Sequence, residues 1–448
     1  MKRILIALAL VLSVQVASAQ ATADAARKAI DKARVATENP KKVDKVATWL
    51  ALGKAYMGAY NQPTVQVLRN SSKAELKLLM NEKQTAPEQK VVVADNPMTK
   101  QTFANKELYF NSNDVLIFVN VTKYPVEDPL YKAFEAYKMA HTKDLSGSKT
   151  KDIAAAMQTI ADSYAVDAEV AYNLGDYATS SAMFEKAAEV TAAAPLNKMD
   201  GVLLSNAALT AQRSANLDRA VELYEKCVAA GYYDEGNIFM RLSLLYSEKG
   251  DKASQKATLE KGVELLPENK DVLIYLIDYY LQNNEDPTRL FELTAKAIQN
   301  NPTNAYPYYA QGTIYDQLSK SETDQTKAEE YIAEAVKSFD KAAEVDPSYE
   351  FSYVGKGQMY FNRAVILNNL ASAELDDNKW MVLRKKTFEA FENAIAPLEK
   401  VYELTTVPQN KLWAAELLKV IYFNLRSEGA QYDEAYNKWN AIYGELSK

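Results

Sequence analysis

The chain has 448 residues, of which 52 are basic and 59 are acidic, and its formal net charge is −7. Because charges of both signs are interspersed along the sequence, the composition argues against nucleic acid or anionic lipid as the main partner. At this length a single hydrophobic core is not expected, since such cores stop growing at about 250–300 residues, and the chain should form several domains or a solenoid.

The first residues have the pattern of a secretory signal peptide. Lys2 and Arg3 give a positive start, and residues 4–14 form an apolar run too short to span a bilayer. The small residues Ala17-Ser18-Ala19 precede the expected cleavage point, so we predict that residues 1–19 are a signal peptide. An N-terminal membrane anchor is the alternative. No cysteine follows the run and no later apolar stretch reaches about 18 residues, so neither a lipid anchor nor an integral membrane segment is expected in the mature chain.

Cysteine usage indicates where the exported chain resides. The chain has one cysteine and therefore cannot form an intramolecular disulfide. This is typical of the bacterial envelope rather than of an animal extracellular space. We predict a location in the periplasm, or in association with the outer membrane, of a Gram-negative bacterium.

Residues 20–60 are expected to form N-terminal helices, of which the second, residues 43–60, carries a distinctive motif. The motif consists of Trp49, Leu52, Gly53 and Tyr56. Spacings of three, one and three residues place all four on one helix face. The large side chains should fill a groove between helices, and Gly53 should let a neighbouring segment come close.

Residues 61–127 have a different character and are predicted to be an insertion with both helix and strand. Residues 91–93, 107–110 and 115–121 are rich in β-branched and aromatic residues and are predicted strands. Asn and Asp at 111–114 predict a hairpin turn between the last two. The insertion is either a recognition surface, in which strands 107–110 and 115–121 offer an edge to an added strand, or a lid packed over the neighbouring helices.

Residues 128–448 return to the helical period in successive pairs with short links. Residues 131–140 are predicted to be the partner of helix 43–60 across the insertion, because loop closure entropy grows only slowly with length. The other expected pairs combine 153–174 with the helix around Phe184, 201–215 with 218–230, 237–249 with the helix that ends at Leu266, 271–282 with 290–298, 305–318 with 328–345, 351–369 with 381–404, and 412–426 with 432–443.

The repetition identifies the family that the chain resembles. The links ending in Pro267, Pro302 and Pro347 recur after similar helices, and the motif of residues 49–56 matches the pattern W-x₂-L-G-x₂-Y. The sequence therefore resembles the tetratricopeptide-repeat superfamily, and in particular exported members of the Bacteroidota cell envelope. This resemblance implies an all-α, right-handed α-solenoid of about eight helix pairs, with the strand-containing insertion inside the first repeat. The chain departs from the pattern where Gln255, Gly262 and Cys227 occupy positions at which Ala is usual.

The resemblance also implies a binding face, since the first helix of each pair lines the concave side of such a solenoid. In the fifth to seventh pairs this face combines aromatic and amide side chains, which suit an extended peptide or an inserted helix. The predicted groove residues are Tyr275, Asp278, Gln282, Tyr306, Tyr309, Thr313, Gln317, Phe351, Gln358, Phe361 and Asn362. The alternative is that many of these rings form the core between repeats.

A second candidate site lies on the corresponding faces of the second to fourth pairs. Arg213 and Arg241 could clamp a carboxylate, because guanidinium geometry suits that group. The alternative is an ordinary solvated face of mixed charge.

Enzymatic chemistry has little support in the sequence. The only histidine, His141, is placed just beyond a helix end, and Cys227, between Tyr224 and Val228, is predicted to be a buried, unreactive thiol. No phosphate-binding glycine loop or calcium loop occurs, so we expect no catalytic residue, cofactor or metal. We predict a non-catalytic protein–protein interaction scaffold or adaptor. The alternatives are a periplasmic chaperone or assembly factor for an outer-membrane secretion or uptake system and, in another class, a carboxylate-dependent polysaccharide hydrolase.

Overall fold

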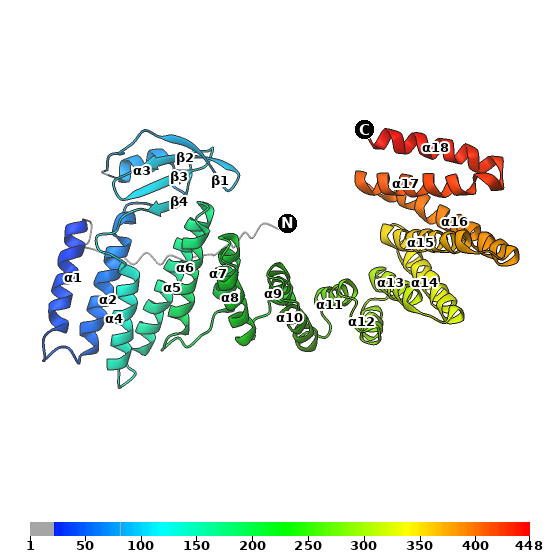
Figure 1. Ribbon diagram of the computed structural model, residues 1–448. Helices are drawn as coiled ribbons and strands as arrows, with labels where there is room; N and C mark the ends of the chain where they lie inside the picture. Colours follow the sequence, from blue (N-terminus) through cyan, green and yellow to red (C-terminus); the bar gives the residue numbers. More distant parts are fainter. Residues whose placement is uncertain (1–21, 81) are drawn as a thin grey trace. The chain divides into compact units, whose positions relative to one another are not determined.

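The computed structural model describes residues 22–80 and 82–448, and the predicted signal peptide lies outside this part (Figure 1). The described residues form eighteen α-helices, three short 3₁₀ turns and four β-strands. The predicted helical solenoid and its eight helix pairs are confirmed. The chain divides into two compact units, the first ending at Asp234 and the second starting at Glu235. None of the described helices is both long and apolar enough to cross a membrane.

The first unit contains eight helices and all four strands. Its elements are α1 (Ala23–Thr37), α2 (Val46–Asn61), α3 (Lys73–Leu79), β1 (Gln89–Val93), β2 (Asn96–Thr102), β3 (Lys106–Phe110), β4 (Leu116–Val121), α4 (Pro129–Lys143), α5 (Thr150–Asn173), α6 (Tyr177–Ala192), α7 (Gly201–Arg213) and α8 (Leu217–Ala229).

Helix α2 packs against α4 although the insertion separates them in the sequence. A Cβ atom on Gly53 would lie 2.8 Å from the ring of Tyr137, so the glycine makes room for an aromatic side chain of the partner helix. The Trp49 indole closes the start of α2 by donating to the Val43 carbonyl at 2.7 Å. The predicted pairing of helix 43–60 with residues 131–140 is therefore confirmed.

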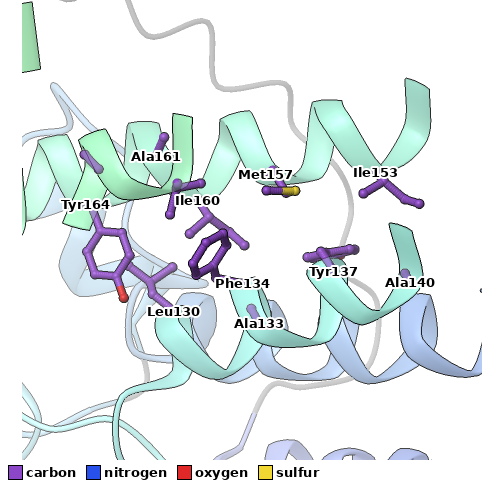
Figure 2. Packing of buried hydrophobic residues seen from close by; sticks show 12 residues of the cluster. Leu130, Ala133, Phe134, Tyr137, Ala140, Ile153, Met157, Ile160, Ala161 and Tyr164 are labelled. Atoms are coloured by element: carbon purple, nitrogen blue, oxygen red, sulfur yellow. The ribbon is translucent and has the colours of Figure 1, made fainter. Parts of the chain in front are cut away.

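The core of the first repeats continues from α4 to α5. Phe134 and Tyr137 of α4 meet Met157 and Ile160 of α5, and all four side chains are buried (Figure 2). Trp49 and Tyr56 of α2 pack against the same cluster. The sequence motif of α2 is thus a packing motif of the first repeat.

The insertion forms a four-stranded antiparallel sheet in the order β1-β2-β3-β4. One face is covered by α3 through a core that includes Leu76, Leu108 and Phe110. The opposite face packs on the C-terminal end of α5 (Figure 1). There Tyr109 and Phe118 meet Val170 and Leu174. Burial of both faces fixes the sheet to the first unit.

Two predictions about the insertion were incomplete or wrong. Strand β2 was not predicted, because Asn96-Pro97 begins it and the segment lacks a run of β-branched residues. The alternative in which strand 107–110 offers an edge to an added strand is wrong, because β3 pairs with β2 on one side and β4 on the other. It follows that β3 cannot accept an added strand. His141 also differs from expectation, since it lies in the last turn of α4 rather than beyond it.

The second unit consists of five helix pairs. They are α9 (Asn237–Glu248) with α10 (Lys252–Leu265), α11 (Lys270–Gln282) with α12 (Pro287–Asn300), α13 (Tyr306–Ser321) with α14 (Gln325–Val345), α15 (Glu350–Ala373) with α16 (Asp377–Leu404), and α17 (Pro408–Leu425) with α18 (Ala430–Leu446). The first helices of successive pairs, α9, α11, α13 and α15, contact one another in sequence order.

The turn inside a helix pair has a repeated chemistry. Gly250 has a φ of 73° and ends α9, and the side chain of Asp251 then accepts from the Ser254 N–H at 3.0 Å to start α10. The same geometry recurs in the first unit at Gly175 and Asp176. Left-handed backbone followed by a side-chain cap therefore fixes the tight reversal within each of these pairs.

Candidate functional site

Three of the predicted groove residues lie in a cluster of rings carried by α13 and the start of α15. We define the aromatic cluster as Tyr306, Tyr309, Tyr349 and Phe351. The Tyr309 ring centroid lies 6.2 Å from Tyr306, 6.0 Å from Tyr349 and 6.2 Å from Phe351, and Tyr349 and Phe351 are 5.6 Å apart. These distances are in the range of favourable aromatic pairs. Helix spacing predicted three of the four rings, whereas Tyr349 precedes α15 and has no helical periodicity to indicate it.

The buried ring of Phe339 packs against the aromatic cluster. Phe339 of α14 is 2 % exposed, and its ring centroid lies 6.0 Å from that of Tyr309. Cβ atoms on Gly312 and Gly355 would lie 2.7 Å and 2.5 Å from the Phe339 ring. The two glycines therefore let α13 and α15 close on the ring, and this packing fixes where the aromatic cluster sits.

One end of the aromatic cluster is tied to α11 by a polar contact. The Tyr306 hydroxyl donates a hydrogen bond to the Asp278 carboxylate. Burial raises the pKa of Asp278, and the Tyr306 hydrogen bond opposes that rise. Burial, together with the Asp278 charge, raises the pKa of Tyr306. The neutral phenol and the carboxylate thus form a fixed polar edge beside the rings.

The exposure of the aromatic cluster is uneven. Phe351 is 47 % exposed, while Tyr306, Tyr309 and Tyr349 are half-buried. A large exposed ring that is held by two partly buried rings, Tyr309 and Tyr349, is a rigid apolar surface. Such a surface can contact an apolar side chain of another protein at low cost in conformational entropy.

The other predicted groove residues lie outside this cluster. Phe361 packs on Phe391 of α16, with 6.1 Å between ring centroids, and so belongs to the core between α15 and α16. The Thr313 hydroxyl donates to the Tyr309 carbonyl at 3.1 Å. Gln282 and Gln358 are exposed, and the remaining residues are half-buried: Tyr275, Gln317 and Asn362.

The two predicted arginines lie in different units. Arg213 is in the first unit, where its guanidinium carbon lies 5.0 Å from the Tyr172 ring centroid and 5.6 Å from that of Tyr177. Arg241 is half-buried in α9 of the second unit. The Tyr172 and Tyr177 ring centroids lie 5.4 Å apart, so the Arg213 guanidinium lies beside a pair of rings, at distances favourable for cation–π interaction.

The first unit also contains a half-buried acid that the sequence did not indicate. Asp167 of α5 accepts a hydrogen bond from the Tyr60 hydroxyl at 3.0 Å, and the Tyr60 ring stacks on Tyr124 with 5.4 Å between centroids. Burial raises the pKa of Asp167 to about 7, and the Tyr60 hydrogen bond opposes that rise. Since Tyr124 follows β4, this contact joins the end of the insertion to α2 and α5.

The other reactive or charged groups considered among the described residues are a cysteine, the residues of two pockets and the possible metal ligands. Cys227 is fully buried, so the predicted burial of this thiol is confirmed, and burial raises the pKa of the thiol to about 12. A pocket between α6 and α8 includes Arg219, whose guanidinium pairs with Glu185 and Glu222. A second pocket is lined by residues of α12 and by Glu268. Neither pocket includes a residue of the aromatic cluster. Within the described part of the chain, no group of three or more His, Cys, Asp or Glu residues is arranged to hold a metal ion.

Comparison with known proteins identifies one repeat directly. Residues 236–269, which comprise α9 and α10, match the family model described as Tetratricopeptide repeat. Gly262 lies in this repeat at a position where Ala is usual, and a Cβ atom there would lie 2.8 Å from both Phe239 and Val272. Among curated proteins, no sequence matches the chain.

Several solved structures of repeat proteins are similar to the chain. A tetratricopeptide-repeat protein from Parabacteroides merdae is 15% identical, with 62% of this chain and 98% of that chain covered and a TM-score of 0.38. One from Bacteroides fragilis is 15% identical, with 63% and 98% covered and a TM-score of 0.30. YrrB, a tetratricopeptide-repeat protein with an unusual peptide-binding site, is 17% identical, with 42% and 88% covered and a TM-score of 0.32.

Proposed function

We propose that this chain is a non-catalytic scaffold that binds a peptide or helix of a partner protein on the face formed by α11, α13 and α15. The match of residues 236–269 to the tetratricopeptide-repeat model supports an interaction role. The aromatic cluster is the observation that carries the proposal. Phe351 presents nearly half of its surface to solvent, and the neighbouring rings hold it in place. Aromatic anchors of this kind dominate the binding energy of many protein interfaces.

The partner that fits this face has an apolar side chain flanked by a hydrogen-bond donor. The apolar side chain would pack on Phe351 and Tyr309. The donor would reach the Asp278 carboxylate, which already accepts from Tyr306 and can accept further hydrogen bonds. Exposed amides at Gln282 and Gln358 would pair with the backbone of the bound segment.

The test replaces Phe351 and a matched ring elsewhere in the same unit. Phe423 of α17 is 50 % exposed, so Phe423→Ala removes a comparable surface ring outside the aromatic cluster. Purified wild-type protein and both variants are used for affinity capture from an envelope extract, followed by quantitative mass spectrometry. We expect Phe351→Ala to lower the recovery of a specific partner by about tenfold or more, as for the loss of an interface anchor. Equal recovery by all three proteins would contradict the proposal.

We further propose that the protein is exported to the envelope, on the pattern of residues 1–19. The charged start, the short apolar run and the small residues before Gln20 support cleavage at that point. Protein isolated from the periplasmic or outer-membrane fraction should begin at Gln20 by N-terminal mass spectrometry. Intact Met1 on protein in the cytosolic fraction would contradict export.

A further inference from the structure

Strand β1 is the free edge of the sheet within the described residues. It pairs with β2 on one side, and no backbone bond joins it to another described segment. The opposite edge, β4, is partly paired. The Leu116 N–H at its start donates to the Ser71 carbonyl at 2.9 Å, and Ser72 forms a bridge with Val115. A free edge exposes unpaired N–H and C=O groups that can bind another strand.

The turn after β1 determines which backbone groups are free. Ala94 and Asp95 have φ values of 48° and 63° and connect Val93 to Asn96, which are register partners. A two-residue loop with both residues left-handed places its flanking pair in mutual hydrogen bonding. Because such pairs alternate along an antiparallel ladder, Val91 bonds to β2, whereas Lys90 and Val92 direct their N–H and C=O groups outward.

The side chains along this edge give little protection against pairing. Val92 is 74 % exposed on the face that carries α3, and Val91 is half-buried on the face that packs toward α5. Lys90 is the only charged side chain in β1, and its ammonium donates to the Thr99 hydroxyl at 3.1 Å. Natural edge strands commonly carry charges, bulges or proline to prevent pairing, and β1 has one such charge.

We propose that β1 pairs antiparallel with β1 of a second copy of this chain, which joins two four-stranded sheets into one. Three symmetric registers would let the outward groups of Lys90 and Val92 form hydrogen bonds. A register centred on Lys90 sets two lysines directly opposite, which is unfavourable, and one centred on Val92 runs into the turn at Ala94. The register centred on Val91 pairs all five residues of the strand.

In the register centred on Val91, the chemistry of the strand is complementary to itself. Lys90 lies opposite Val92 of the other copy, so the two lysines are kept apart. Val91 meets its own counterpart, and β-branched pairs of this kind are favourable in sheets. The outward N–H and C=O groups of Lys90 and Val92 form four hydrogen bonds between the copies.

The first test removes one outward donor. Val92→Pro deletes an N–H that β2 does not use, and Val92→Thr retains that N–H with a β-branched side chain. Sedimentation equilibrium over a range of concentrations should give about twice the mass of the chain for the wild type and Val92→Thr, and the mass of one chain for Val92→Pro. Unchanged far-ultraviolet circular dichroism controls for folding. A monomeric wild type, or a Val92→Pro variant that remains a dimer, would overturn the proposal.

The second test addresses the register. Val91→Lys and Val91→Glu should each be monomeric, because like charges would face each other at the centre of the pair. An equimolar mixture of the two should form a heterodimer, detected by native mass spectrometry. Failure of the folded variants to combine would overturn the register centred on Val91, and dimers of either variant alone would do the same.

Discussion

At the residue scale, close approach between helices depends on particular glycines. Gly53→Ala would place a Cβ atom 2.8 Å from the Tyr137 ring, so we expect a loss of about 1–3 kcal/mol in the free energy of unfolding despite the better helix propensity of Ala. Gly444 lies inside α18 with no neighbour within 4 Å, so Gly444→Ala should stabilise by up to about 1 kcal/mol. Urea unfolding measures both changes. A stabilising Gly53→Ala would contradict the close packing of α2 and α4.

The half-buried acid Asp167 gives stability a pH dependence with a defined sign. Its pKa is raised to about 7 in the folded chain, above the ordinary value of 3.8, so the folded state binds the proton more tightly than the unfolded state does. The free energy of unfolding therefore falls as pH rises from about 4 to about 7.

Asp167→Asn removes this titration and tests it. Relative to the wild type, the variant should gain about 2 kcal/mol or more in the free energy of unfolding between pH 4.5 and pH 8. Urea unfolding at several pH values measures the difference. A difference that does not change with pH would show that folding does not raise the pKa of Asp167.

At the element scale, the insertion should be coupled to α5 rather than loosely attached. Phe118 is 6 % exposed, stacks on Tyr109 with 4.4 Å between centroids and packs toward Val170. Phe118→Ala should therefore cost about 3–5 kcal/mol. Its neighbour Ile117 is 42 % exposed, so Ile117→Ala should cost less than about 1.5 kcal/mol.

Unfolding measurements on both variants, with limited proteolysis of residues 61–127, check this coupling. Faster cleavage of the insertion in Phe118→Ala than in Ile117→Ala is expected. Equal stability of the two variants would indicate that the sheet does not pack on α5.

The helices could be predicted from the sequence because their signals are local. Apolar periodicity, Gly-Asp turns such as Gly250-Asp251 and terminal prolines indicate a helix without knowledge of its neighbours. Strand β2 could not be found in this way, since Pro97 weakens its strand signal and its existence depends on pairing with β1 and β3. The buried face of a helix could also be predicted, but not which helix packs on that face. Phe361 was therefore grouped with the rings of the predicted groove, whereas it packs on Phe391.

At the scale of the whole molecule, the division at Asp234 predicts two unfolding transitions. The junction has three consecutive left-handed residues, with φ values of 46° at Asp234, 52° at Glu235 and 96° at Gly236. Differential scanning calorimetry should show that Phe339→Ala lowers only the transition of the second unit, by removing a fully packed ring. Phe118→Ala is the reciprocal control and should lower only the other transition. A single transition that both variants shift equally would contradict independent units.

The split first repeat has a consequence for the order of folding. Most helix pairs join through a few residues and can form as soon as both helices have been synthesised. Helix α2 must instead wait for α4, because residues 62–128 lie between them. Closing this loop costs entropy before Gly53 and Tyr137 make contact. The N-terminal repeat should therefore be the last to assemble, after the repeats further along the chain have formed. Mutations at this contact should then accelerate unfolding and leave the rate of folding nearly unchanged.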